Sequence, residues 1–518
     1  MSQKIEILDC TLRDGGYYTN WDFDQEIIEN YCDAMESLPI DYVEVGYRSI
    51  PLPGYLGEYF YCPEYLLKQL KKLMPSKKLA IILNEKDTSL SNLNFLLKPC
   101  EGYIDLVRIA INPLRIKSAI KLAKGVKEMG FKVAFNVMYM SEWDETDNMF
   151  VHLRKLDKHV DYFYMVDSFG GVMPEKIEKI IRAIQKETSV ELGFHGHDNL
   201  EMALANTRSA INGGCKIVDA TITGMGRGAG NLRTELLLTY LDGIGELKVN
   251  YNKLGAVVSK YEELKKEYSW GTSLPYMFSG ANSLPQKQVM EWVGMNRYPL
   301  GSIVNALNNQ KDDVQDNLKL PELSKENRFK KAIILGGGNT ARKNSNAIIK
   351  LIAQNELNDI CLIHAGARNV SEYLEVECPQ YYALVGFESE KLLNRVKNFE
   401  VKSQICVYPP FPRKMGTLIP DKIKSICREL NAITFTNSSS DSPLTVALQI
   451  ALDFGVSEIL LAGFDGYDTN LNEIQLKLSR ENQEIFDDLL INEQISLISL
   501  TPTKYKNLNV QSLYSFVK

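Results

Sequence analysis

The sequence predicts an α/β protein in which two parallel-sheet domains follow one another along the chain. In the N-terminal half, short β-rich apolar runs alternate with amphipathic segments of helical period, and a second alternation begins at Lys331. Alternation of this kind is typical of βαβ units. Eight such units in about 240 residues match a closed (β/α)₈ barrel. A doubly wound open sheet stays the alternative, because periodicity does not distinguish the two.

The bulk composition is that of a globular protein with more than one domain. The chain has 518 residues, of which 45% are hydrophobic and 24% charged, so two or three domains are expected. The formal net charge of -6 argues against a nucleic-acid partner. No apolar run is long enough to span a bilayer, and we expect no cleavable leader before the first strand. Nine dispersed cysteines without a C-x-x-C pair favour reduced thiols and a cytoplasmic location.

The predicted elements of the barrel follow the apolar runs. The expected strands are residues 5–8, 42–45, 79–83, 106–111, 133–139, 162–166, 190–194 and 217–222. The clearest helices between them are 24–36, 64–73, 116–129, 174–186 and 200–212. Together they predict a barrel domain over residues 1–250.

The rest of the chain divides into three parts. Residues 251–307 are expected to form a helical extension that covers the barrel mouth or makes a homodimer interface. Residues 308–330 are polar without an apolar period, which predicts a linker. Residues 331–518 are expected to form a Rossmann-like open parallel sheet, with strands at 332–335, 360–364, 381–385, 405–408, 433–436 and 458–462.

Polar residues gather at the carboxyl ends of the predicted barrel strands, which is where (β/α)₈ barrels carry their active sites. They are Asp9, Arg13 and Asp14; Glu44 and Arg48; Arg108; Asn136; Asp167 and Ser168; His195, His197, Asp198 and Asn199; and the loop 224–231. The sequence therefore predicts that these polar side chains meet at one site, at the carboxyl ends of the barrel strands.

The strongest candidate for a metal site is the pair His195 and His197. Alternate residues of a strand point to the same side, so the two imidazoles can bind one cation. Asp14 adds a carboxylate, and such a set suits Mn²⁺, Mg²⁺, Fe²⁺ or Zn²⁺ with positions left for substrate. The plainer interpretation makes both histidines hydrogen-bonding loop residues.

The glycine-rich loop 224–231 has two compatible interpretations. It can be a tight turn that ends in a helix cap at Asn231. It can also form a backbone wall that lets a substrate approach, with the Asn231 amide oxygen near the metal.

Four motifs carry a resemblance to a known family. Asp9-x-Thr11-Leu12-Arg13-Asp14-Gly15, Val166-Asp167-Ser168-x-Gly170, residues 193–199 and Gly226-x-x-Ala229-Gly230-Asn231 resemble the DRE-TIM metallolyases, which include enzymes like HMG-CoA lyase. The pattern is most similar to that of the 4-hydroxy-2-oxovalerate aldolases. The resemblance implies reversible cleavage of a 4-hydroxy-2-oxo acid into pyruvate and an aldehyde. It implies a divalent ion, often Mn²⁺, with Mg²⁺, Zn²⁺ or Co²⁺ as alternatives.

The resemblance also assigns roles. Asp14, His195 and His197 would be metal ligands, with Asn231 a further or outer ligand. Arg13 would stabilise the enolate, and Glu44 joins the catalytic candidates. One departure affects the assignment, because the aldolases place a catalytic histidine at the position of Tyr17. Tyr17 is therefore a candidate for proton transfer, and substrate packing is its other interpretation.

The C-terminal half carries a weaker motif. Gly336-x-Gly338-Asn339-x-Ala341 follows a predicted strand, which fits a dinucleotide-binding turn, with Gly336, Gly338 and Asn339 as candidate contacts. The next strand lacks the acid that would hold a ribose. A nucleotide or phosphorylated ligand is the expectation, and a merely tight turn is the alternative.

Two further functions stay open. One is a Claisen-type acyltransferase that condenses an acyl-CoA with a 2-oxo acid. The other is a binding or scaffold protein whose barrel has lost activity through the change at Tyr17.

Overall fold

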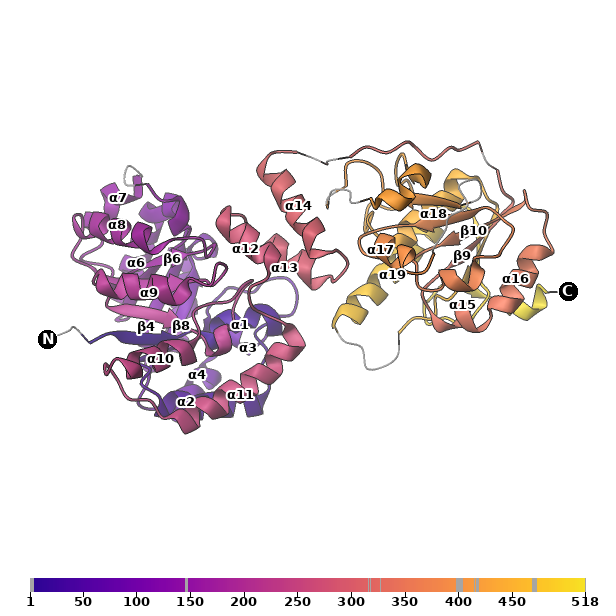
Figure 1. Cartoon of the computed structure of the whole chain (residues 1–518). Coiled ribbons are helices and arrows are strands. Elements are labelled where there is room, and N and C mark those ends of the chain that lie inside the picture. Colours follow the sequence, from indigo (N-terminus) through magenta and orange to yellow (C-terminus); the bar gives the residue numbers. More distant parts are fainter. Residues whose placement is uncertain are drawn as a thin grey trace. The chain divides into compact units, whose positions relative to one another are not determined.

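The computed structural model describes residues 4–144, 148–314, 316, 318–326, 328–396, 404–413, 415, 419–467 and 473–517. The chain separates into two compact units, which we name the barrel unit (Met1–Met290) and the C-terminal unit (Glu291–Lys518). Figure 1 colours the chain from indigo at the N-terminus to yellow at the C-terminus. Each unit is described by itself.

The barrel unit contains a closed parallel barrel whose strands neighbour one another in chain order. Leu8 of the first strand pairs with Asp219 of the last, which closes the sheet. The predicted (β/α)₈ barrel is confirmed. The strands are β1 (Glu6–Asp9), β2 (Tyr42–Tyr47), β3 (Lys78–Asn84), β4 (Leu106–Ile111), β5 (Lys132–Val137), β6 (Tyr162–Asp167), β7 (Glu191–Gly196) and β8 (Ile217–Ala220).

Helices enclose these strands (Figure 1). Helix α8 illustrates why: Ile177, Ile180, Ile181 and Ile184 recur at helical spacing and are buried, so one stripe of the helix packs on the sheet. The helices of this unit are α1 (Thr11–Thr19), α2 (Gln25–Ser37), α3 (Glu58–Tyr61), α4 (Glu64–Leu73), α5 (Leu93–Leu97), α6 (Ile116–Glu128), α7 (Asn148–His152), α8 (Pro174–Gln185), α9 (Ala203–Asn212), α10 (Thr234–Gly243), α11 (Tyr251–Tyr268) and α12 (Leu274–Ala281). Helix α13 (Gln286–Gly294) contains the point at which the two units divide.

The barrel interior is layered. An apolar layer contains Leu8, Tyr42, Ala80, Leu106 and Ala134, among others. Two residues further along the strands, at the same parity, the interior becomes polar, as at Glu44, Arg108 and Asn136, which hydrogen bond to one another. The strand alternation therefore places buried charges directly below the mouth.

The C-terminal unit contains an eight-stranded parallel sheet of order β13-β12-β11-β10-β9-β14-β15-β16. The expected open parallel sheet is confirmed. Strands β10 to β13 lie on one side of β9, and strands β14 to β16 lie on the other, so the topological switch point is between β9 and β14. In such sheets ligands bind beside the strand ends at the switch point. The strands are β9 (Lys331–Leu335), β10 (Ile360–His364), β11 (Gln380–Ala383), β12 (Gln404–Tyr408), β13 (Cys427–Glu429), β14 (Glu458–Ala462), β15 (Ser496–Ser499) and β16 (Asn509–Val510).

Two details of this sheet differ from the sequence prediction. The strand expected at 433–436 is wrong: these residues are irregular, and the short strand β13 precedes them. Strands β15 and β16 were not predicted. The helices are α14 (Leu300–Lys311), α15 (Asn339–Lys343), α16 (Ser345–Ala353), α17 (Glu388–Leu393), α18 (Pro443–Asp453) and α19 (Glu473–Asn492). Residues 308–311 of the expected linker belong to α14, and residues 315, 317 and 327 lie outside the described part.

Helix α16 packs on the sheet through Ile348, Leu351 and Ile352, which share a buried cluster with Ile333 and Leu362 of the strands. Helix α18 lies against β9, β10 and β11. Within the described residues, no helix is both long and apolar enough to cross a membrane.

Candidate active site

A cavity of about 210 Å³ opens at the carboxyl ends of the barrel strands. Of the seven barrel residues to which the sequence prediction gives a catalytic or metal-binding role, five line this cavity: Arg13, Asp14, Tyr17, His195 and His197. Residues lining it include Arg13, Asp14, Tyr17, Tyr47, Asn136, Ser168, His195, His197, Arg227 and Gln286. Glu44 and Asn231 do not line the cavity but lie directly behind Arg13 and Asp14.

Asp14, His195 and His197 form a compact group of metal-ligating atoms. One ligand atom from each residue lies within 4.8 Å of the other two. Oδ2 of Asp14 is 3.9 Å from Nε2 of His195. Asp14 comes from helix α1, whereas the histidines come from β7 and the residue beyond it, so the fold joins positions about 180 residues apart in the sequence.

Hydrogen bonds fix the orientation of both imidazoles. Nδ1 of His195 lies 2.8 Å from Oδ2 of Asp219, and Nδ1 of His197 lies 2.8 Å from the backbone oxygen of Asp167. Both oxygens accept, so each Nδ1 carries a proton and Nε2 is the nitrogen of each ring that is left for a metal ion. This is the arrangement in which metal-binding histidines are usually held.

The charges around the group also fit a divalent cation. Among the buried groups, the carboxylates of Asp14, Glu44 and Asp219 outnumber the guanidiniums of Arg13 and Arg108 by one, while the partly exposed Arg227 lines the same cavity. The amide of Asn231 donates to Asp14, while its Oδ1 is buried without a hydrogen bond to any described residue. A bound cation would offset the excess charge and give the orphaned oxygen a partner.

The pKa values follow from burial and from these charges. Burial alone would raise the pKa of Asp14, but Arg13 and the two histidines bring it below its ordinary value. Burial, with His195 close by, lowers the pKa of His197 to about 4. At neutral pH the group therefore offers an ionised carboxylate and a neutral imidazole, which are the forms that bind metal.

Behind the group formed by Asp14, His195 and His197, a network of buried ion pairs runs across the barrel. Glu44 accepts hydrogen bonds from Nε of Arg13 at 2.8 Å and from Nη1 of Arg108 at 3.0 Å. Arg108 also donates to Asp219 and lies over the ring of Tyr164, with 4.3 Å between guanidinium carbon and centroid. Asp219 was not predicted as a site residue, because it lies inside the apolar run 217–222; strand parity with His195 is the signal that would have found it.

Tyr17 lies on the cavity wall with its hydroxyl 3.1 Å from that of Tyr47. Burial raises the pKa of Tyr47 well above its ordinary value, so Tyr47 keeps its proton and is able to donate to Tyr17. The guanidinium of Arg227 lies over the Tyr17 ring, 5.4 Å from its centroid.

Glycines let the backbone approach the metal group. A Cβ built on Gly226 would lie 2.3 Å from Nδ2 of Asn231 and 3.0 Å from Oδ2 of Asp14, so any larger residue here would displace one of these side chains. A Cβ on Gly15 would lie 2.6 Å from the sulfur of Met225. Gly15 and Gly16 therefore lie inside helix α1, where they allow close packing, and do not form a loop.

The glycine turn of the C-terminal unit has a different environment. The turn follows β9, and α15 begins at Asn339. Cβ atoms on Gly336 and Gly338 would meet Gly463 and Asp465 of the loop after β14. Asp465 accepts a hydrogen bond from the amide of Thr340 at 3.0 Å, so a phosphate placed there would face a carboxylate. This geometry argues against a dinucleotide pyrophosphate on Gly336, Gly338 and Asn339.

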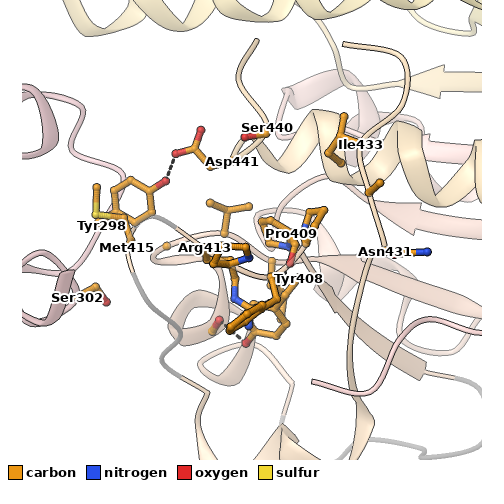
Figure 2. Close-up of a pocket in the computed structure, with 18 of the residues that line it drawn as sticks. Tyr298, Ser302, Tyr408, Pro409, Arg413, Met415, Asn431, Ile433, Ser440 and Asp441 are labelled. Carbon is orange, nitrogen blue, oxygen red and sulfur yellow. Dashed lines mark hydrogen bonds between the residues drawn. The ribbon is translucent and has the colours of Figure 1, made fainter. Parts of the chain in front are cut away.

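Two cavities open beside the strand ends of that unit. One, of about 430 Å³, is lined by Tyr298, Tyr408, Pro409, Asn431 and Thr436, among others. Figure 2 shows Tyr298 pointing toward Asp441, to which its hydroxyl donates. The other, of about 620 Å³, lies at the switch point and is lined by residues that include Gly337, Arg368, Asp465, Tyr467 and Lys504. Val385 lines both.

Comparison with known proteins agrees with this geometry. Residues 111–258 match the family described as HMGL-like. A 4-hydroxy-2-oxovalerate aldolase of Geobacillus thermodenitrificans is 29% identical over 247 residues, which cover 47% of this chain and 71% of that enzyme. An oxaloacetate decarboxylase of Mycobacterium tuberculosis is 25% identical over 242 residues, covering 46% and 71%.

One solved structure is more similar. The N-terminal domain of a proposed aldolase from Bacteroides vulgatus is 53% identical, with a TM-score of 0.56. The match covers 58% of this chain and all of that domain. Together with the family match, the closed barrel and the candidate metal-ligating group at its mouth identify the barrel unit as an HMGL-like (DRE-TIM) domain. The chain belongs to the HMGL-like family, and its C-terminal unit lies beyond the family match, which ends at residue 258.

Proposed function

We propose that the barrel unit is a divalent-metal-dependent lyase that cleaves a 4-hydroxy-2-oxo acid into pyruvate and an aldehyde, and also catalyses the reverse addition. The observation that carries the proposal is the group Asp14, His195 and His197 beside the guanidinium of Arg13 in one cavity. Cleavage leaves negative charge on the 2-oxo oxygen, and fixed cations beside that oxygen stabilise it.

The residues present fit a divalent ion, which Asp14, His195 and His197 would hold. When bound, the ion would supply a Lewis acid for the keto and carboxylate oxygens of the 2-oxo acid. Arg13 contributes a second positive charge at the same wall. Glu44, expected as a catalytic residue, is fully buried behind Arg13 and fixes its guanidinium, so we assign it a positioning role.

Tyr17 is proposed to move the proton of the 4-hydroxyl group. As the base, Tyr17 would act in its phenolate form, and a hydrogen bond donated by the Tyr47 hydroxyl, 3.1 Å away, would stabilise that form before it takes the proton. The guanidinium of Arg227, which lies over the Tyr17 ring, would also stabilise the negative charge of the phenolate.

The experiment is an aldol-cleavage assay with 4-hydroxy-2-oxovalerate, the full chain and Mn²⁺, in which pyruvate release is followed by coupled reduction. We expect turnover that EDTA abolishes and that His195→Ala reduces at least ~100-fold together with metal content. His159→Ala, outside the cavity wall, is the matched control. An inactive His195→Ala protein that binds Mn²⁺ like the wild type would contradict the proposed site.

Decarboxylation of oxaloacetate is the second candidate. It produces the same enolate but takes no proton from a 4-hydroxyl group, so it needs no base at Tyr17. One relative carries that name. Pyruvate release from oxaloacetate, with none from 4-hydroxy-2-oxovalerate, would favour it, and product from acetyl-CoA plus a 2-oxo acid would favour the Claisen reaction.

We also propose that the C-terminal unit binds a nucleotide-bearing or phosphorylated molecule along its strand ends. Support comes from the switch-point cavity, with Arg368 and Lys504 on its wall, and from the neighbouring cavity with tyrosine and amide side chains. Calorimetry of the full chain with ADP, UDP-glucose and NAD⁺ tests this. Binding below about 1 mM that Arg368→Ala weakens is expected, and no binding of any of the three would contradict it.

A further inference from the structure

The cavity of the barrel unit contains a second guanidinium that the proposed lyase chemistry leaves without a substrate contact. Arg227 lies in the loop after β8 and lines the same cavity as Asp14, His195 and His197. Its guanidinium makes no hydrogen bond or ion pair with any residue that the structure describes.

This distinguishes Arg227 from Arg13. Arg13 is paired with Asp14 and Glu44, so its charge is balanced by the protein. Arg227 is only partly exposed, and among the described residues no ion pair joins its guanidinium to Asp14, the acid of the same cavity wall, or to any other acid. A partly desolvated cation in a cavity is costly unless a bound anion pairs with it, and arginine suits carboxylate and phosphate groups in particular.

The position of Arg227 is fixed by its surroundings. The Tyr17 ring supports the guanidinium at 5.4 Å. The backbone oxygen of Arg227 accepts from the amide of Gly230 at 3.2 Å, and the next residue, Gly228, accepts from the hydroxyl of Tyr18 at 3.1 Å. On the other side, Gly226 packs against Asn231 and Asp14 with no room for a Cβ. The loop therefore presents the cation to the cavity before any ligand binds.

We propose that Arg227 binds a carboxylate or phosphate group at the far end of the aldehyde half of the substrate. The proposal rests on the proposed lyase function. The carboxylate and keto oxygens of the 2-oxo acid are assigned to the metal group and Arg13, while Tyr17 serves the oxygen of the aldehyde half. Because Arg227 contacts Tyr17, it lies on the aldehyde side, and the enzyme should prefer anionic aldehydes.

The test measures pyruvate aldol addition by the full chain with Mn²⁺ and two matched aldehyde pairs. D-glyceraldehyde 3-phosphate is compared with D-glyceraldehyde, and succinic semialdehyde with butanal. We expect the wild type to favour the anionic member of at least one pair in kcat/KM. Arg227→Gln should reduce that preference about 10- to 100-fold, and Arg227→Lys should keep part of it.

Two results would overturn the assignment. If Arg227→Gln leaves the ratio of anionic to neutral kcat/KM as in the wild type, Arg227 does not bind the aldehyde's anionic group. If it raises the KM of pyruvate while the ratio stays constant, Arg227 binds the 2-oxo acid instead. Failure of the lyase proposal has a separate signature, because then the wild type adds pyruvate to none of the four aldehydes.

Discussion

Nδ1 of His195 lies 2.8 Å from Oδ2 of Asp219, and this contact determines which nitrogen of His195 faces the cavity. Asp219 is itself held by Arg108, which joins it to Glu44 and so to Arg13. One chain of buried hydrogen bonds thus connects the imidazole of the metal group to the guanidinium beside it. Burial would raise the pKa of Asp219, but Arg108 and His195 bring it below its ordinary value, so it accepts as a carboxylate.

We predict that Asp219→Asn weakens Mn²⁺ binding about 10- to 100-fold, since the amide no longer holds His195 as firmly in its Nδ1-protonated form. Calorimetric titration of the metal-free protein measures the affinity. Asp161→Asn is the control, because Asp161 is also ion-paired but lies at the opposite end of the barrel strands, before β6. Unchanged affinity in Asp219→Asn would show that this contact does not orient a metal ligand.

Gly226→Ala should lose more free energy of Mn²⁺ binding than free energy of unfolding. The added methyl group would lie 2.3 Å from Nδ2 of Asn231 and 3.0 Å from Oδ2 of Asp14, so one of these side chains must move. Overpacking of this kind costs about 1–3 kcal/mol. Gly243→Ala is the matched control, since its Cβ would meet nothing within 4 Å. The free energy of unfolding and the Mn²⁺ affinity are measured for both, and equal affinities would contradict the prediction.

Tyr17→Phe is predicted to lower kcat for aldol cleavage by about 100-fold, because it removes the hydroxyl that takes the proton. Tyr17→His should restore turnover, since an imidazole can act as a base at this position. The control is Tyr65→Phe, which removes an exposed hydroxyl bonded to Glu58. Full activity of Tyr17→Phe would leave Tyr17 as a packing residue.

The C-terminal unit should lose stability as the pH falls from about 6.5 to 4 because of His364. Burial lowers the pKa of this histidine to about 4, although its hydrogen bond to Gln380 acts the other way. The unfolded chain therefore takes up the proton first, and stability rises with pH across this window. Between pH 7.5 and 5.0 the wild type should lose about 2 kcal/mol more than His364→Gln.

Amide hydrogen exchange of peptides from β10 and β11 measures this difference locally, through the free energy of opening. His364→Gln retains a group able to donate to Gln380, so the fold is expected to persist. The same pH dependence in both proteins would show that His364 does not cause it.

The barrel, and the position of the two histidines at its mouth, were predictable because they follow from strand alternation. Apolar runs of the right length marked the strands, and His195 and His197 share one parity on β7 and just beyond it. The carboxylate that orients His195 was not predicted, because Asp219 stands between apolar neighbours and only its cross-barrel partner Arg108 gives it a role. Such a contact depends on the register between strands distant in sequence.

In the C-terminal unit, by contrast, the sequence predicts a strand that does not form. Residues 433–436 have the composition of a strand, yet Phe435 and Thr436 are buried in an irregular segment, where Asp488 accepts from Thr436 and Asn492 donates to the Phe435 carbonyl. The strand that forms, β13, has only three residues, and its buried Glu429 pairs with Arg413. Tertiary partners rather than local pattern decide both segments.

The measurement that tests the central proposal most directly is exchange of the pyruvate methyl protons in D₂O, followed by NMR with the full chain. We predict Mn²⁺-dependent exchange that EDTA stops and that His195→Ala reduces at least ~100-fold, whereas His159→Ala does not. No exchange by the Mn²⁺-loaded wild type, or exchange that persists in His195→Ala, would contradict enolisation of a 2-oxo acid at this site.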